Sequence, residues 1–145
     1  MHKNDTPGSG SVLQMRLVVE AGDYEEAVAF YRDALGLPEE LAVAGPDGAQ
    51  VTILDAGHAT LEIANPAQRD YIDRVETGRT GVAPKIRVAF EVTNASAATE
   101  LLVAAGATLI AAPVETPWRS LNARLSAPGG LQLTLFEELE PPNDR

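Results

Sequence analysis

Residues 85–106 read KIRVAFEVTNASAATELLVAAG. They repeat residues 14–35, QMRLVVEAGDYEEAVAFYRDAL, without a gap at a shift of 71 positions. Each copy starts with a β-prone run and continues into a helix that begins at an N-cap residue and carries one apolar stripe. A repeat of this kind indicates two similar structural units in one chain. The matching positions include Arg16 with Arg87, Glu20 with Glu91 and Asp23 with Asn94.

Three further short β-prone runs follow the helix in each copy, separated by turn signals. A shift of 72 aligns the last runs and places Glu62 on Thr134. Each copy therefore reads βαβββ, and the sequence predicts an α+β fold of two tandem βαβββ modules. The predicted strands are 13–20, 40–45, 49–55 and 59–64 in the first copy, and 85–92, 108–112, 119–126 and 131–136 in the second.

The segment between the copies is about 20 residues long, which is unusual for a loop without structure inside one domain. We expect a short helix near Tyr71 to Glu76 that covers part of the fold. Both ends of the chain are polar and rich in Gly, Pro or acidic residues, so they read as loosely attached tails. The predicted organisation is an N-terminal tail 1–11, a first module 12–64, a linker 65–84, a second module 85–137 and an acidic tail 138–145.

Composition narrows the class of protein. The 145 residues, 45% of them apolar, suit one compact body with a single core. The chain has no cysteine and no apolar run near the roughly 20 residues of a membrane helix, so we expect a cytoplasmic protein. Its net charge of −10 repels phosphate backbones and anionic lipid, which disfavours nucleic acid and membrane surfaces as partners.

Alternation along the predicted strands gives each one an apolar face and a mixed polar face. In residues 85–92, Ile86 and Val88 share the apolar face, while Arg87 and Glu91 lie on the other. If the sheets curve, the polar faces line a cup. The other polar-face residues singled out as candidates for ligand binding are Arg16, Glu62, Trp118, Asn122, Arg124 and Thr134.

Several local motifs resemble the vicinal oxygen chelate superfamily, which includes glyoxalase I, bleomycin resistance proteins and extradiol dioxygenases. The motifs are Gly22-Asp23-Tyr24 at the helix start, Leu35-Gly36-Leu37 at its end, and Ala127-Pro128-Gly129-Gly130-Leu131 before the last strand. The resemblance covers roughly residues 13–137. It implies two four-stranded sheets that close into a binding cup, and a homodimer.

The family's metal ligands would match Arg16, Glu62, Arg87 and Thr134 in this sequence. Metal-dependent members carry His or Gln at the first and third of these positions, and Glu at the second and often the fourth. Arginine stays protonated and has no lone pair to give, so Arg16 and Arg87 cannot bind a cation. We therefore expect no metal ion and no other cofactor.

The polar-face arginines can serve two purposes. A guanidinium fork grips a carboxylate or phosphate, so Arg16 and Arg87 can anchor an anionic ligand while Trp118 stacks on an aromatic ring. Alternatively, the arginines form an internal ion-pair network with glutamates such as Glu62, and Trp118 covers a sheet edge or a dimer contact. The candidate glutamates of that network also include Glu20 and Glu91, with Arg124 as a further arginine.

These observations predict a protein that binds a small organic molecule, aromatic and anionic, without a metal. By resemblance, it sequesters a drug or metabolite as bleomycin resistance proteins do. The competing interpretation is an enzyme, a lyase, isomerase or dioxygenase that uses Glu62 as a catalytic base or a non-standard metal site. A third class, a protein-interaction module, is favoured if ion pairs fill the inner faces.

Overall fold

The computed structural model describes residues 14, 16–60, 62 and 64–139. The whole predicted N-terminal tail, residues 1–11, and residues 140–145 of the predicted C-terminal tail lie outside this part. The described elements are α1 (Tyr24–Val28), which continues as a π-helix (Ala29–Ala34), β1 (Glu39–Ala44), β2 (Gln50–Leu54), α2 (Pro66–Thr77), β3 (Val88–Glu91), α3 (Ala95–Ala104), β4 (Thr108–Glu115), β5 (Ser120–Ala127) and β6 (Leu131–Glu138), with short 3-10 turns at Pro46–Gly48 and Pro128–Gly130.

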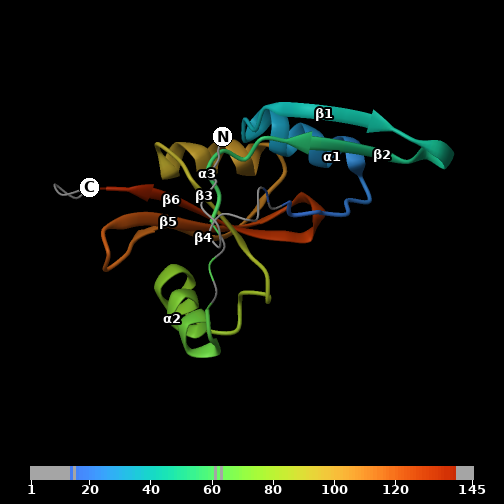
Figure 1. The fold of residues 1–145 in the computed structure, drawn as a ribbon. Coiled ribbons are helices and arrows are strands. Elements are labelled where there is room, and N and C mark those ends of the chain that lie inside the picture. Colours follow the sequence, from blue (N-terminus) through green and yellow to red (C-terminus); the bar gives the residue numbers. More distant parts are fainter. Residues whose placement is uncertain (1–13, 15, 61, 63, 140–145) are drawn as a thin grey trace, which may run out of the picture.

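The second module forms the four-stranded sheet that its βαβββ pattern predicts. Its strand order is β3-β6-β5-β4, and β3 runs parallel to β6 while the other pairs are antiparallel. The helix α3 connects β3 to β4 and lies on one face of this sheet (Figure 1). The α+β fold is therefore confirmed.

Both predicted helix starts are confirmed by their capping bonds. The backbone N–H of Glu26 donates to Oδ1 of Asp23 at 3.0 Å, and the N–H of Ala97 donates to Oδ1 of Asn94 at 2.9 Å. Each bond satisfies a donor that the first turn of a helix leaves free. Gly36 has a φ of 92°, and this left-handed conformation ends the first helix.

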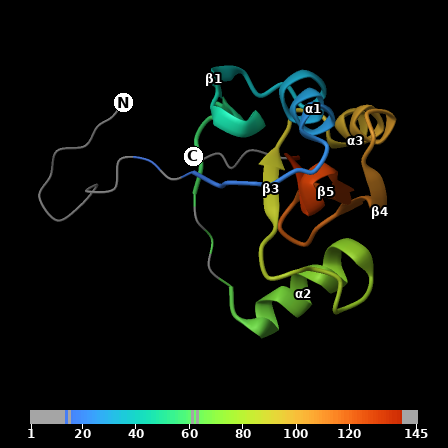
Figure 2. The same ribbon diagram turned by 90° about the vertical axis from the view of Figure 1, so that its right-hand side faces the viewer.

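The apolar core lies between the sheet and the helices α1 and α3, on the side of the sheet away from α2 (Figures 1 and 2). Leu125, Leu133 and Leu135 project from the central strands, and Phe30 and Leu102 meet them from the helices. All five side chains are almost completely buried. The strand alternation predicted this apolar face, because Leu125, Leu133 and Leu135 share one parity along their strands.

The first module differs from the four-stranded sheet that the resemblance implies. Its described residues form one antiparallel pair, β1 with β2, which extends away from the body of the molecule (Figure 1). The prediction of strands over 13–20 and 59–64 is wrong for the residues that the structure describes there, because none of them forms a strand. Residues 13, 15, 61 and 63 lie outside the described part of the chain. Strand propensity reflects fit to a paired, half-buried surface, so a β-prone run without a hydrogen-bonded neighbour stays irregular.

Among the described residues, none of the helices has the length and apolar character needed to cross a membrane.

Candidate anion-binding site

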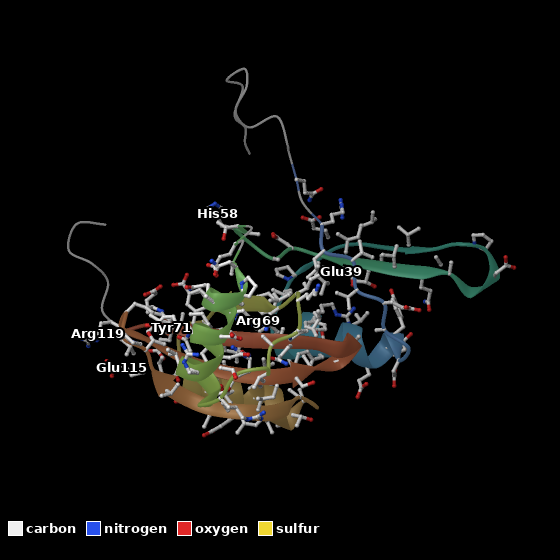
Figure 3. All side chains as sticks on the ribbon, turned by 90° about the horizontal axis from the view of Figure 1, so that it is seen from below. Glu39, His58, Arg69, Tyr71, Glu115 and Arg119 are labelled. Atoms are coloured by element: carbon white, nitrogen blue, oxygen red, sulfur yellow. The ribbon has the colours of Figure 1, made fainter. Side chains whose placement is uncertain are left out.

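The helix α2 covers the polar face of the four-stranded sheet (Figures 1 and 3). It begins after the N-cap Asn65, with Pro66 in its first turn, and it ends at Gly78, whose φ is 81°. It is longer than the helix predicted near residues 71–76. Its two most deeply buried residues are both acidic, Asp73 at 0% and Glu76 at 4% exposure. The sheet therefore has an apolar layer on one side and a charged layer on the other.

Arg124 on β5 is the centre of the charged layer and is 0% exposed. Its Nη1 donates to Oδ1 of Asp73 at 2.9 Å and to Oε1 of Gln132 at 2.7 Å. Its Nε donates to Oε1 of Glu76 at 2.9 Å, and its Nη2 lies 2.9 Å from the same oxygen. A guanidinium this far from solvent is tolerated only because carboxylates compensate its charge.

Three donors from the sheet converge on the Glu76 carboxylate. Oε1 accepts hydrogen bonds from Nε of Arg124 at 2.9 Å and from Oγ1 of Thr134 at 2.8 Å. Oε2 accepts from Nδ2 of Asn122 at 2.9 Å. Oγ of Ser120 donates to Oδ1 of Asn122 at 2.7 Å, which fixes the amide with its nitrogen toward Glu76. We call Asn122, Arg124 and Thr134 the carboxylate cradle.

Besides its contact with Arg124, Asp73 also accepts hydrogen bonds from the loop after α2. Its Oδ2 accepts from the backbone N–H groups of Val82 at 2.9 Å and Ala83 at 3.0 Å. Burial by itself raises the pKa of Asp73, because it disfavours the charged form. The hydrogen bonds from these two N–H groups and from Arg124 outweigh burial and lower the pKa below its usual value. The side chain is therefore held as a carboxylate.

Arg87 lies beside the cradle and just before β3. Its side chain is partly buried, and its Nη1 donates to Oγ1 of Thr134 at 2.5 Å. Burial, and then the positive charge of Arg124, lower the pKa of Arg87, yet an arginine stays protonated. Within the described part of the chain, no carboxylate lies within 4.0 Å of its guanidinium, so its charge lacks a direct partner.

The structure does not gather all the predicted site residues. Arg16 and Glu62 are exposed, and the described residues place no ion pair between Glu62 and either arginine predicted to face it. Glu62 is still near enough for its charge to raise the pKa of Arg87, a minor effect beside burial. Glu20 and Glu91 are also exposed and take no part in the network around Arg124.

Trp118 lies in the turn between β4 and β5 and is 45% exposed. Its ring packs at a tilt against Tyr71 of α2, with ring centroids 6.1 Å apart (Figure 3 labels Tyr71). The sheet register places this turn far from Arg87. Val88 pairs with Leu133 and Ser120 with Glu138, which is about 17 Å along β6 at 3.4 Å per residue. The structure therefore does not bring Trp118 and Arg87 to one small ligand.

Sequence reasoning missed the two acidic partners of Arg124. Asp73 and Glu76 are three residues apart, so they share one side of a helix. Ile72 and Val75, both partly buried, follow the same helical spacing beside them. Carboxylates within an apolar helix stripe, in a chain with several polar-face arginines, are the signal that predicts such pairing.

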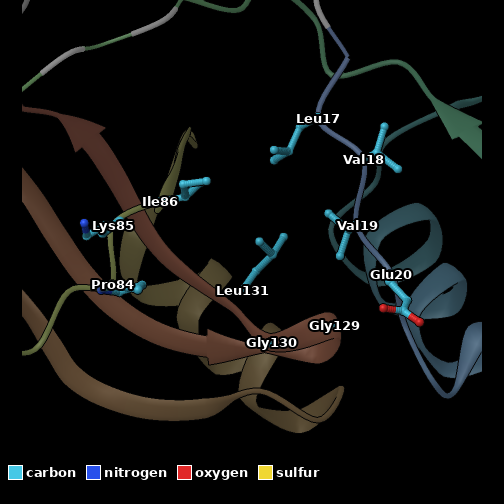
Figure 4. A pocket seen from close by; sticks show the side chains of 10 residues that line it. All are labelled: Leu17, Val18, Val19, Glu20, Pro84, Lys85, Ile86, Gly129, Gly130 and Leu131. Carbon is cyan, nitrogen blue, oxygen red and sulfur yellow. The ribbon is translucent and has the colours of Figure 1, made fainter.

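The described part of the structure also has a hollow of about 390 Å³ at the edge of the sheet (Figure 4). Residues 17–20 form one side, and residues 84–86 with the turn at 129–131 form the other. Most of its walls are apolar, and its charged members, Glu20 and Lys85, have opposite signs. None of the predicted site residues lines it, so it is separate from the carboxylate cradle.

Residues 16–136 match the family described as the glyoxalase-like domain. The chain belongs to this family, within the vicinal oxygen chelate superfamily. No curated protein matches the sequence. Among solved structures, a glyoxalase/bleomycin resistance protein/dioxygenase family enzyme from Burkholderia phytofirmans is 20% identical with a TM-score of 0.51, and the match covers 81% of this chain and 91% of that one.

Two further structures share the fold at similar identity. A glyoxalase I mutant from Zea mays is 19% identical with a TM-score of 0.54, over 81% of this chain and 44% of the maize chain. A protein of unknown function from Agrobacterium tumefaciens is 20% identical with a TM-score of 0.50, over 89% and 98% of the two chains. Likeness at this level shows the fold and leaves the activity open.

The residues at the superfamily's metal positions do not fit a metal ion. Arg16 and Arg87 have no lone pair to offer. The Thr134 hydroxyl already donates to Glu76 and accepts from Arg87. Within the described ranges, no three His, Cys, Asp or Glu side chains are grouped to hold a metal. The site combines guanidinium, amide and hydroxyl donors with the carboxylates of Asp73 and Glu76, which accept their hydrogen bonds.

Proposed function

We propose that this protein binds a small organic anion on the inner face of its second module without a metal ion, and that sequestration of this ligand is its function. The observation that carries the proposal is the Arg87 guanidinium, which is partly buried against Thr134 and has no carboxylate within ion-pair distance among the described residues. A partly desolvated cation of this kind gains most from a ligand that supplies the missing carboxylate.

The charges of Glu76, Glu62 and Asp73, in this order, raise the pKa of Arg87, but none of these carboxylates lies within ion-pair distance of its guanidinium in the described structure. Asp73 and Glu76 direct their oxygens to Arg124, to the cradle amide and hydroxyl, and to backbone N–H groups. The two guanidiniums and two carboxylates cancel in formal charge, and the whole chain carries −10. An anion is therefore recognised by the forked geometry of Arg87 at short range, and long-range attraction contributes little.

The competing function is catalysis by Glu62. A general base works best when its surroundings hold it in place and exclude water. Glu62 is exposed, and neither Arg16 nor Arg87 pairs with it in the described part of the chain. No observation favours catalysis over binding, so the binding protein is the function that the geometry supports best.

Calorimetric titration at constant ionic strength tests the proposal. The panel contains acetate, succinate and benzoate, with benzylamine as the cationic control. We expect at least one carboxylate to bind, and Arg87→Gln to weaken binding at least about tenfold, the effect of losing one charged contact. Arg79→Gln is the matched control, because Arg79 is exposed in the loop after α2 and should leave the affinity unchanged.

Two results would overturn the proposal. One is that no carboxylate of the panel binds more tightly than millimolar. The other is that Arg87→Gln binds them as well as the unmodified protein does. Comparison of benzoate with acetate shows whether an aromatic ring adds affinity, which tests the predicted aromatic character of the ligand.

A further inference from the structure

The carboxylate cradle is built like a ligand site, and a side chain of the same protein occupies it. Asn122, Arg124 and Thr134 all project from the sheet, and all three donate to one carboxylate. That carboxylate belongs to Glu76 on α2, a separate helix that lies on the sheet from outside (Figures 1 and 3). An amide, a hydroxyl and a guanidinium around both oxygens is the donor set that a bound carboxylic acid requires.

We infer that α2 is a built-in competitor for the ligand: Glu76 holds the place of the ligand's carboxylate, and a small carboxylic acid enters the cradle when α2 moves off the sheet. This inference rests on the proposed function and names the class of ligand and its regulation. The Thr134 hydroxyl contacts both Glu76 and Arg87, so the cradle and the Arg87 guanidinium form one continuous site.

The way in which α2 is attached allows such an exchange. Among the described residues, none of those that form the buried apolar core belongs to α2. Its most deeply buried side chains are Asp73 and Glu76, so polar contacts contribute to its attachment to the sheet, beside the partly buried Ile72 and Val75. An incoming carboxylate can accept the hydrogen bonds that Glu76 accepts, and the contact between Asp73 and Arg124 must break as well when the whole helix moves. The chain after α2 contains Gly78 and Gly81, both at positive φ, where glycine changes conformation at little cost.

Competition of this kind has a measurable consequence. A tethered group competes at an effective concentration of roughly millimolar or above, so Glu76 weakens the apparent affinity for any free carboxylate. Removal of the Glu76 carboxylate should therefore tighten carboxylate binding. A purely structural role of Glu76 would also leave a cavity that acetate can fill, but it does not predict that a carboxylate displaces α2 in the unmodified protein.

The first experiment is chemical rescue of Glu76→Ala. We expect this variant to melt at a lower temperature than the unmodified protein, because three donors lose their acceptor. Sodium acetate or propionate, with sodium chloride held as the ionic-strength control, should restore the melting temperature with a saturating dose dependence. By calorimetry, acetate should bind the variant at least about tenfold more tightly than the unmodified protein. Asp70→Ala on the same helix is the matched control and should gain no affinity, because the Asp70 side chain is 40% exposed and its ion pair is with Arg69.

The second experiment needs no variant, so it holds if Glu76→Ala fails to fold. Hydrogen exchange of the unmodified protein is followed without and with saturating acetate or succinate. We expect amides of α2, residues 66–77, to exchange faster with the carboxylate present, while amides of α3 stay unchanged.

The outcomes separate this inference from the proposed function. One outcome is that carboxylates bind through Arg87, but bind Glu76→Ala no more tightly than the unmodified protein and do not speed amide hydrogen exchange in α2. In that case the competitor role of α2 is wrong and the proposed function stands. If acetate rescues Glu76→Ala and yet Arg87→Gln binds as well as its parent, the cradle is a carboxylate site and the role given to Arg87 is wrong. If acetate neither rescues Glu76→Ala nor speeds amide hydrogen exchange in α2, the inference is overturned.

Discussion

Oε1 of Glu76 lies 2.9 Å from Nε of Arg124, and the two residues come from segments 48 positions apart in the sequence. Both side chains are almost fully removed from solvent. The contact fastens the helix between the two modules to the inner face of the second one. The same contact places a carboxylate where the anion of a ligand is expected, so stability and binding depend on the same atoms.

Arg124→Met should lower the free energy of unfolding by about 3–5 kcal/mol, because Asp73 and Glu76 lose the charge that compensates them in a buried place. Urea denaturation at neutral pH measures the effect. Glu115→Ala, which breaks the exposed ion pair with Arg119, is the control and should change stability little. A loss for Arg124→Met no greater than that of the control would show that the network around Arg124 does not form.

The lowered pKa of Asp73 predicts how stability depends on pH. The folded protein holds this group as a carboxylate below its ordinary pKa of 3.8, while the unfolded chain takes up a proton there. The stabilisation is therefore fully present above the unfolded value and is lost as the pH falls through the lower, folded value. Urea midpoints measured between pH 3 and pH 6 should drop more steeply for the unmodified protein than for Asp73→Asn. Parallel curves would contradict the assignment.

The sequence predicts the second module well and the first only in part. Helix starts at Asp23 and Asn94 depend on local capping, and the apolar parity of Leu133 and Leu135 depends on alternation within a strand. Such signals are short in range, so they survive in the folded chain. Residues 16–20 are equally β-prone, yet whether they form a strand depends on a distant partner that the sequence does not specify.

The partners of the site arginines are the clearest case of this limit. Parity along the strands correctly placed Asn122, Arg124 and Thr134 on one polar face. It could not supply their partners, because Asp73 and Glu76 reach that face from a helix outside the repeat. The internal network that was one of two alternatives for the arginines does exist around Arg124, but its carboxylates come from α2. The exposed Glu62 takes no part in it in the described structure.

Burial raises the pKa of Tyr31 to about 12, and its hydroxyl donates to the carbonyl oxygen of Pro128 at 2.7 Å. This contact stabilises the fold below pH 10.0, the ordinary value, and its contribution is lost as the pH rises through the folded value. Tyr31→Phe should cost about 1 kcal/mol at neutral pH. In a spectroscopic titration of tyrosinate it should remove the component that titrates near pH 12. If that component persists in the variant, it belongs to another tyrosine.

The turn at Gly129 tests whether residues 16–20 lie against the second module. Gly129 has a φ of 83°, and a Cβ at this position would lie 2.8 Å from Cγ1 of Val19. Gly48 has a similar φ of 80°, but nothing lies within 4 Å of its Cβ position. Alanine at either site pays the same backbone strain. Gly129→Ala should therefore be less stable than Gly48→Ala by about 1–3 kcal/mol, the cost of forcing an extra methyl group into a packed contact.

Urea denaturation of the two variants gives this difference directly, and Val19→Ala combined with Gly129→Ala should recover part of it. If the two glycine variants lose equal stability, backbone strain alone explains both, and Val19 does not pack on the turn.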